Sequence, residues 1–305
     1  MPGSPKVAVT QNSTIALALQ EALSHLELEE LVRGRVVALK PNDTWASEDD
    51  TTAVTQPDTL RAVLRFLKTL QPKQLVVTGG SGAGQTEDVF RIGGLMQVLE
   101  EEDVEFFDHN RPPFREVLLA YSPEKDVRGP QRSVMVNPRV MEYETLISLA
   151  QLKVHETATV TLCLKNIAMS FPAADYYGHP RHSQKHANSF FNDMHSFIAT
   201  MSKRFPTHLG IIVGHPAMIG IGPIGGHTFE TGLVIASRDP VAADTVGARL
   251  LGFTPRGVHH LWEAHQLGVG EIDTEAMNFP AMTMDEAFAA FTQAAYGTKL
   301  ELEHA

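Results

Sequence analysis

The sequence has 305 residues, of which 43% are hydrophobic and 20% charged, and its formal net charge is −11. This composition is typical of a soluble globular protein, and the negative charge disfavours nucleic acid or an anionic membrane as a partner. The single cysteine, Cys163, excludes a disulfide framework and any iron–sulfur cluster that this chain would hold by its own cysteines. Because no apolar run reaches about 18 residues and the first residues lack a signal-peptide core, we expect a cytoplasmic protein.

Apolar runs and amphipathic stretches alternate through the first half of the chain. Buried strands are predicted for residues 6–10, 35–41, 74–80 and 104–108, and helices for 13–25, 56–70 and 86–103. The last helix is predicted as one element despite Gly93 and Gly94. Residues 112–132 read as an irregular segment, either a lid or a boundary.

The second half continues the alternation. Strands are predicted for residues 145–149, 209–214 and 232–237, and helices for 160–169, 189–203 and 239–252. Asp239 is expected to cap the last of these helices, with Pro240 in its first turn. The pattern predicts an α/β protein with a mostly parallel sheet and helices on both faces, arranged as two packed lobes, 1–150 and 151–305, or as one compact unit.

A glycine-rich turn, TGGSGAGQTED, lies between a predicted strand and a predicted helix. It resembles a phosphate-binding loop from Gly79 to Gly84, but Gln85 stands where that loop has a lysine and a dinucleotide fingerprint has its third glycine. Two interpretations stay open: a phosphate bound by backbone N–H groups, or a flexible loop that lines a pocket. Gly80 and Gly82 are the ligand-binding candidates here.

Histidines are concentrated between His155 and His227, where eight of the 14 occur. His179, His182 and His186 lie within eight residues, a spacing that a transition metal can use, and His195 follows on a predicted helix. These four are the candidate metal ligands, with no element specified. The alternative is a solvated histidine-rich loop with no metal.

Polar or glycine-rich residues follow several predicted strands, and ligands in open α/β sheets bind beyond the carboxyl ends of strands. Lys40 and Asn42 follow one strand, and the loop that contains Gly222 and Gly225 follows another. We therefore expect these segments to meet at one ligand pocket.

The stretch LKVHETATVTLCLKN, residues 152–166, places charged side chains in a run that otherwise reads as buried. A buried ammonium is costly unless it is paired or binds an anion. Lys153, His155, Lys165 and Asn166 are therefore predicted to face the same pocket, His155 for acid–base work and Lys165 for electrostatic stabilisation. Alternatively, Lys165 reaches solvent and Asn166 closes a helix end. Asp244 is expected to brace its helix, although it could orient a pocket lysine or histidine.

The succession LKPN, LKVHETATVTLCLKN, GIGPIGG and ASRDPVAADTVGARLLG resembles the DUF362 family over roughly residues 35–270. The resemblance implies one compact α/β domain without a settled activity, and some relatives are fused to ferredoxin-like iron–sulfur modules. With one cysteine, this chain carries no such module. It also has Gly214, His215 and Ile219 where relatives tend to have acidic residues, so no role of those carboxylates is carried over.

Two functions follow from these observations. The first is an enzyme that acts on a small anionic metabolite, with a histidine-bound transition metal as an open option. The second is a non-catalytic ligand- or cofactor-binding module that serves a redox partner. An enzyme should hold titratable groups at hydrogen-bond distance from a reacting atom, whereas a carrier needs only shape and charge. The sequence specifies neither substrate nor oligomeric state.

Overall fold

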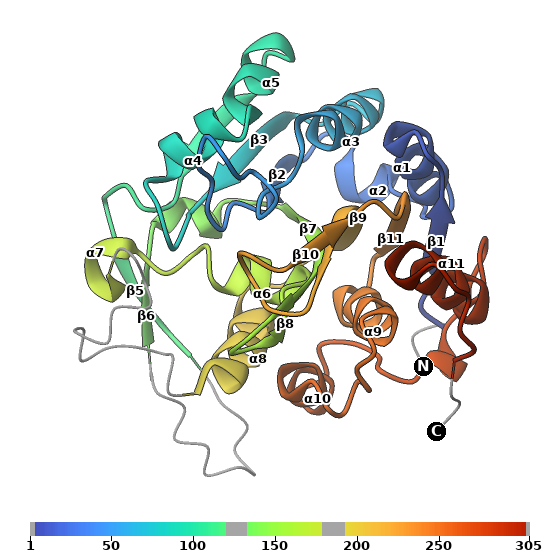
Figure 1. Cartoon of the computed structure of the whole chain (residues 1–305). Coiled ribbons are helices and arrows are strands. Elements are labelled where there is room, and N and C mark those ends of the chain that lie inside the picture. The colour runs from blue at the N-terminus through green and yellow to red at the C-terminus, as the bar shows by residue number, and fades with distance from the viewer. Residues whose placement is uncertain (1–3, 120–132, 179–192, 303–305) are drawn as a thin grey trace.

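A computed structural model describes residues 4–119, 133–178 and 193–302 of the chain. A nine-stranded sheet runs through this part in the order β1-β11-β9-β7-β2-β3-β4, with β10 beside β9 and β8 beside β7 (Figure 1). The strands are β1 (Val7–Gln11), β2 (Val36–Pro41), β3 (Gln74–Gly79), β4 (Glu105–Asp108), β7 (Thr145–His155), β8 (Thr159–Val160), β9 (Leu209–Ile219), β10 (His227–Phe229) and β11 (Leu233–Ser237).

The five strands from β9 to β4 are parallel, and β11 and β1 add antiparallel strands at one edge. The mostly parallel α/β architecture predicted from the sequence is therefore confirmed. Strand β1 pairs with β11, so the first and last thirds of the chain share one edge of the sheet. The predicted lobe boundary at residue 150 falls inside β7, and the division into folding units stays a prediction.

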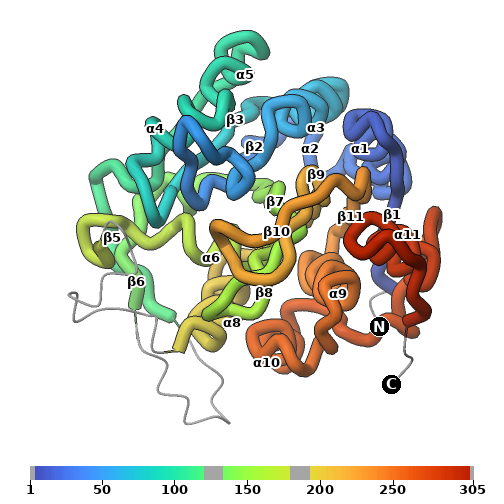
Figure 2. Tube along the Cα trace, viewed as in Figure 1, coloured from blue at the N-terminus to red at the C-terminus, as the bar shows by residue number. Residues whose placement is uncertain are grey.

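Helices cover both faces of this sheet because its central strands are apolar on both sides. In β2, Val37 and Leu39 belong to one core, and Ala38 between them belongs to the other. Figure 2 follows the trace through the two layers. The core that contains Val37 and Leu39 is completed by helices α1 (Ile15–Ser24), α2 (Glu29–Val32), α3 (Pro57–Thr69), α4 (Thr86–Ile92) and α5 (Leu95–Glu101). The core that contains Ala38 is completed by helices α6 (Cys163–Ala168), α7 (Ala174–Tyr177), α8 (Met194–Arg204), α9 (Pro240–Leu250), α10 (His259–Gln266) and α11 (Met284–Tyr296).

Two predicted elements differ from the structure in the first half. The single helix expected over residues 86–103 is wrong, because the chain breaks between α4 and α5 where Gly94 adopts a left-handed φ of 73°. The segment expected to be irregular contains a strand, β5 (Arg115–Leu118), which pairs with β6 (Ser133–Val136) in a separate two-stranded sheet. Residues 120–132 lie outside the described part.

The stretch around residue 155 also differs. The strand expected to end at Leu149 continues to His155, and the helix expected from Val160 begins only at Cys163. The strand can continue through Lys153 because the buried Lys153 nitrogen finds hydrogen-bond acceptors inside the protein. The cap of α9 is as predicted, since Asp239 accepts a hydrogen bond from the Ala242 N–H at 2.9 Å. No helix in residues 4–119, 133–178 and 193–302 is long and apolar enough to cross a membrane.

Candidate functional site

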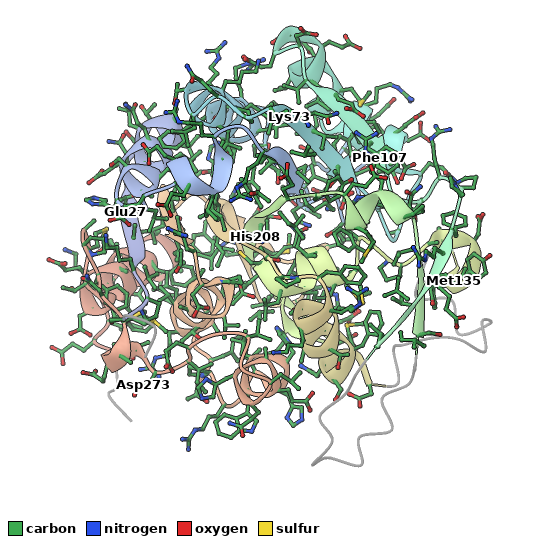
Figure 3. The ribbon with its side chains drawn as sticks, turned by 180° about the vertical axis from the view of Figure 1, so that it is seen from behind. Glu27, Lys73, Phe107, Met135, His208 and Asp273 are labelled. Carbon is green, nitrogen blue, oxygen red and sulfur yellow. The ribbon has the colours of Figure 1, made fainter. Side chains whose placement is uncertain are left out.

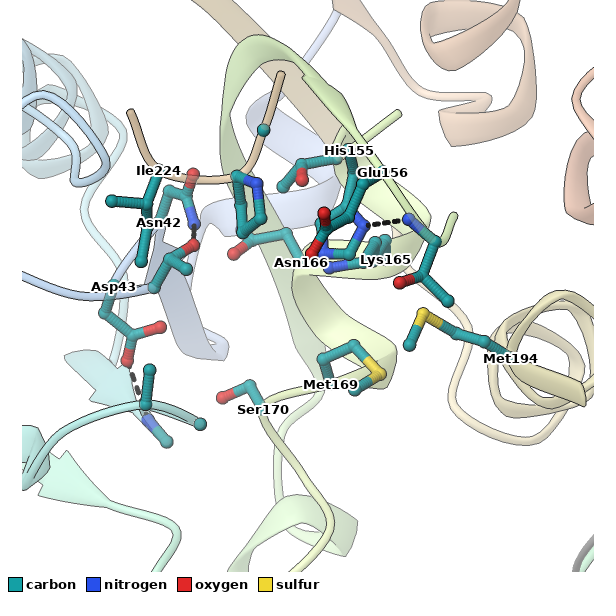
Figure 4. A pocket seen from close by; sticks show the side chains of 18 of the residues that line it. Asn42, Asp43, His155, Glu156, Lys165, Asn166, Met169, Ser170, Met194 and Ile224 are labelled. Atoms are coloured by element: carbon teal, nitrogen blue, oxygen red, sulfur yellow. Dashed lines mark hydrogen bonds between the residues drawn. The ribbon is translucent and has the colours of Figure 1, made fainter. Parts of the chain in front are cut away.

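A cavity of about 580 Å³ lies at the carboxyl ends of β2, β3 and β7 (Figure 4). Its wall is made by the turns after these strands, by α6 and by the glycine-rich loop after β9. The lining residues are Asn42, Asp43, Thr44, Gly80, Gly82, Ala83, His155, Glu156, Thr157, Thr161, Lys165, Asn166, Met169, Ser170, Met194, Ile221, Gly222, Pro223 and Ile224.

Most of the residues predicted to meet at a pocket do line this cavity. They are Asn42, Gly80, Gly82, His155, Lys165, Asn166 and Gly222. Three do not: Lys40 and Lys153 are fully buried outside the lining, and Gly225 belongs to the adjacent loop without lining the cavity. The structure thus brings the predicted segments together, but of the three lysines Lys40, Lys153 and Lys165 it places only Lys165 in the cavity wall.

Helix α6 carries Lys165 and Asn166, and a carboxylate fixes its start. Asp244 on α9 accepts hydrogen bonds from the backbone N–H groups of Cys163 at 2.7 Å and Leu164 at 2.9 Å. The first N–H groups of a helix have no partner within it, so this carboxylate supplies the missing acceptor. Asp244 braces a neighbouring helix rather than its own, and burial raises the pKa of its carboxyl to about 7.

Lys165 lies in the cavity wall with its side chain almost fully enclosed, at 7% exposure. Within the described part of the chain, its ammonium has neither a hydrogen-bond acceptor nor a carboxylate partner. Burial lowers the pKa of Lys165 to about 7. Near neutral pH this side chain therefore exists both as an ammonium and as a free amine.

Lys40, by contrast, is paired. Its ammonium donates to Asp43 Oδ1 at 2.6 Å and to Asn166 Oδ1 at 3.3 Å, and also contacts the Pro41 carbonyl. Asn166 in turn donates from Nδ2 to the Lys40 carbonyl and to Ser148 Oγ, both at 3.0 Å. The Asn166 amide is thus engaged in holding α6 against β2 and β7.

Lys153 is fully buried and donates to Thr44 Oγ1 at 3.2 Å and to the Ala53 carbonyl at 3.1 Å. Burial, with the Lys165 charge as the next contribution, holds the pKa of Lys153 well below its ordinary range. Its contacts tie the end of β7 to the segment after β2. Lys153 therefore helps to position the end of β7 beside the cavity.

His155 lines the cavity as a neutral imidazole. Its Nδ1 accepts hydrogen bonds from the Thr157 N–H at 3.1 Å and the Ala158 N–H at 3.2 Å, so the ring proton is on Nε2. Burial, with the Lys165 and Lys153 charges, lowers the pKa of His155 to about 2. In this state the ring is a hydrogen-bond donor through Nε2, and Nδ1 is occupied by the two backbone donors. The acid–base role expected of His155 from the sequence stays a prediction.

His195 supports the same turn from α8. Its ring hydrogen-bonds to the Thr157 backbone, and its Nδ1 accepts from the His260 backbone N–H at 3.2 Å. His195 is absent from the cavity lining. Of the four candidate metal ligands, His179, His182 and His186 lie outside the described residues. Within the described ranges, no three histidine, cysteine or carboxylate side chains are grouped so as to hold a metal ion.

Two of the predicted glycines bring backbone segments into close approach. A Cβ atom at Gly80 would lie 2.1 Å from the Ser170 carbonyl oxygen, and one at Gly222 would lie 2.2 Å from the Val154 carbonyl oxygen. The Gly80 N–H donates to Asp43 Oδ2 at 2.8 Å. That donor is therefore directed at a protein carboxylate, which favours the pocket-lining interpretation of this loop over the phosphate-binding one.

Polar atoms in the cavity wall are left without partners. Among the described residues, Asn42 Oδ1 and Thr161 Oγ1 have no hydrogen-bond partner although both atoms are buried. Buried polar groups in native proteins are normally satisfied, so such atoms indicate a site for bound water or ligand. They lie in the same wall as Lys165 and His155.

The lining residues that were not predicted from the sequence include Asp43, Ser170, Met169 and Met194. Asp43 directly follows the predicted Lys40–Asn42 segment, so a carboxylate three residues after a buried lysine was the signal that could have identified it. The two methionines and the serine carry no such signal, because nothing local distinguishes a cavity wall from a core.

Three comparisons relate this chain to known proteins. The model of the family "Domain of unknown function (DUF362)" matches residues 37–249, more than half of the chain. Thylakoid-associated protein sll1697 of Synechocystis sp. is 26% identical over 248 residues, which cover 81% of this chain and 72% of that protein.

Among solved structures, the lactate racemase apoprotein of Thermoanaerobacterium thermosaccharolyticum is similar with a TM-score of 0.45 and 13% identity, over 81% of this chain and 57% of that one. A Thermotoga maritima protein has a TM-score of 0.45 and 12% identity, over 79% of this chain and 60% of that one. This chain thus spans less than two thirds of either solved chain.

Proposed function

This chain belongs to the DUF362 family, and from the chemistry of its cavity we propose that it is an enzyme acting on a small anionic metabolite. One observation carries the proposal: the ammonium of Lys165 is enclosed in a cavity wall and has no partner in the described part of the chain. An enclosed cation without a counter-ion is a liability for folding, and an anionic ligand would relieve it.

Two carboxylates line the cavity, and neither pairs with Lys165. Asp43 pairs with Lys40, and the exposed Glu156 is not at ion-pair distance from Lys165, so the Lys165 ammonium has no carboxylate partner among the described residues. Figure 4 places Asp43 across the cavity from Lys165 and His155. A carboxylate or phosphate would therefore bind at the Lys165 end, where His155 Nε2–H is an additional donor.

In catalysis, Lys165 and His155 would exchange the roles that were expected from the sequence. With a pKa of about 7, Lys165 can both accept and give a proton near neutral pH, the property required of a general acid–base group. Neutral His155 would donate a hydrogen bond to an oxygen that gains negative charge during the reaction. A carrier that serves a redox partner needs no side chain with a shifted pKa, so Lys165 favours an enzyme.

The experiment combines binding with turnover. Small carboxylates and phosphates are screened by thermal shift, and those that bind are incubated with the protein in D₂O and followed by proton NMR for deuterium exchange. Wild type and Lys73→Met should respond, whereas Lys165→Met should neither bind nor exchange. Lys73 is the matched control because it is exposed and lies at the amino end of β3, whereas the cavity lies at the carboxyl end of that strand (Figure 3). Equal responses from Lys165→Met and wild type would contradict the proposal.

A further inference from the structure

The three buried lysines near the cavity differ in what their nitrogen atoms contact. Lys40 Nζ is held by Asp43 and Lys153 Nζ by Thr44 and the Ala53 carbonyl. Lys165 Nζ makes no comparable contact with any described residue, and its side chain lines the cavity. When it loses its proton, its lone pair is therefore free to react with a molecule in the cavity.

The surroundings of Lys165 favour the free amine. Apolar side chains of Met169, Met194 and Ile224 contribute to the cavity wall around the buried Lys165. Desolvation of this kind is one of the ways in which proteins activate lysine as a nucleophile. The pKa of about 7 is in accord with this geometry.

A donor for the oxygen of a carbonyl group is present in the same wall. The His155 ring is fixed by its two Nδ1 contacts, and Nε2–H has no hydrogen-bond partner in the described part of the chain. A lysine amine that lines the same cavity as this donor is an arrangement that suits carbonyl addition.

We propose that Lys165 forms an imine with a small aldehyde or ketone that carries a carboxylate, an assignment that rests on the proposed function and names its substrate class. The nitrogen lone pair attacks the carbonyl carbon, and the former double-bond pair takes a proton on oxygen. The resulting carbinolamine loses its oxygen as water while the carbon–nitrogen double bond forms. Amine and carbonyl compound thus give imine and one water, with no oxidant or reductant.

The test traps the imine by reduction. The full chain is incubated with glyoxylate or pyruvate and sodium cyanoborohydride near pH 7.5, and the modified residue is identified by peptide mapping that separates Lys153 from Lys165. In wild type, Lys165 should be modified at least about tenfold faster than the exposed Lys73, because the amine of Lys165 is substantially deprotonated at this pH whereas an exposed lysine amine is not. Circular dichroism establishes that each variant is folded.

Lys165→Arg is the decisive variant because it keeps the positive charge but has no nucleophilic amine. It should lose the adduct and retain a thermal shift with acetate, whereas Lys165→Met should lose both. Modification of wild-type Lys165 no faster than Lys73 would overturn the imine. If acetate still stabilises wild type in that case, the proposed function stands without it; if acetate has no effect either, both fail.

Discussion

Asp244 on α9 accepts a hydrogen bond from the backbone N–H of Cys163, the first residue of α6, at 2.7 Å. The second carboxylate oxygen accepts from Leu164 at 2.9 Å, so one side chain satisfies two donors at the start of the helix that carries Lys165. The two residues are 81 positions apart in the chain. The cavity wall is thus positioned by a contact between distant segments.

Replacing Asp244 by alanine should lower the free energy of unfolding by about 2–4 kcal/mol, because two buried N–H groups lose their acceptor. Asp244→Asn keeps one acceptor, so its free energy of unfolding should lie between those of Asp244→Ala and wild type. Urea denaturation measures both. The exposed Asp49→Asn is the control and should stay within about 0.5 kcal/mol of wild type. A loss for Asp244→Ala no larger than that of the control would mean that the cap contributes little.

The Lys40–Asp43 pair should behave as a structural ion pair. Asp43→Ala leaves the Lys40 ammonium buried without its carboxylate and should cost about 3–5 kcal/mol. The double variant Lys40→Met/Asp43→Ala removes both charges and should recover much of this loss. Denaturation of Lys40→Met, Asp43→Ala and the double variant gives the coupling. Additive losses would show that the two charges do not interact.

Gly80→Ala should disturb the cavity wall, because its Cβ atom would lie 2.1 Å from the Ser170 carbonyl oxygen. Gly84→Ala in the same loop is the matched control, since its nearest neighbour is a Val89 methyl group at 3.1 Å that can shift. Thermal melts should show a clearly larger loss for Gly80→Ala, of about 1–3 kcal/mol. Equal losses would argue that the loop moves away from Ser170 without cost.

Local patterns were sufficient for most of the fold. Leu60, Val63, Leu64 and Leu67 lie on one face of α3 and are all fully buried, as their spacing predicts. The end of β7 was misjudged because a lysine in a strand reads as a strand end. Only the tertiary contacts of Lys153 with Thr44 and Ala53 make its burial tolerable.

The location of the candidate site was predictable, because the turns after β2, β3 and β7 meet at the carboxyl ends of these parallel strands. The separate roles of its lysines were not. Whether a buried ammonium is paired, as in Lys40, or without a partner among the described residues, as in Lys165, depends on side chains from distant segments. No spacing along the sequence records these contacts.

The Lys165→Met variant should change how stability depends on pH. The unfolded chain holds the Lys165 proton up to its ordinary pKa of 10.5, whereas the folded protein releases it near 7. Between these values the unfolded state binds more protons, so the free energy of unfolding rises with pH by up to about 1.4 kcal/mol per unit. The variant lacks this contribution.

Denaturation of wild type and Lys165→Met from pH 7 to 10.5 isolates the contribution of Lys165, because the other titratable groups are present in both proteins. The variant should be more stable than wild type at pH 7, and its advantage should shrink as the pH rises. A difference that does not change with pH would argue against a shifted pKa at Lys165.

The pKa of Lys165 can be measured directly by NMR on protein with isotope-labelled lysine side chains, and it decides whether this amine titrates near neutral pH. The signal missing from Lys165→Met assigns the resonance, and the exposed Lys73 provides an internal reference. We expect a midpoint near 7 for Lys165 in the free protein and a higher midpoint when a small carboxylate is bound. A midpoint near the ordinary 10.5, unchanged by any anion, would contradict it.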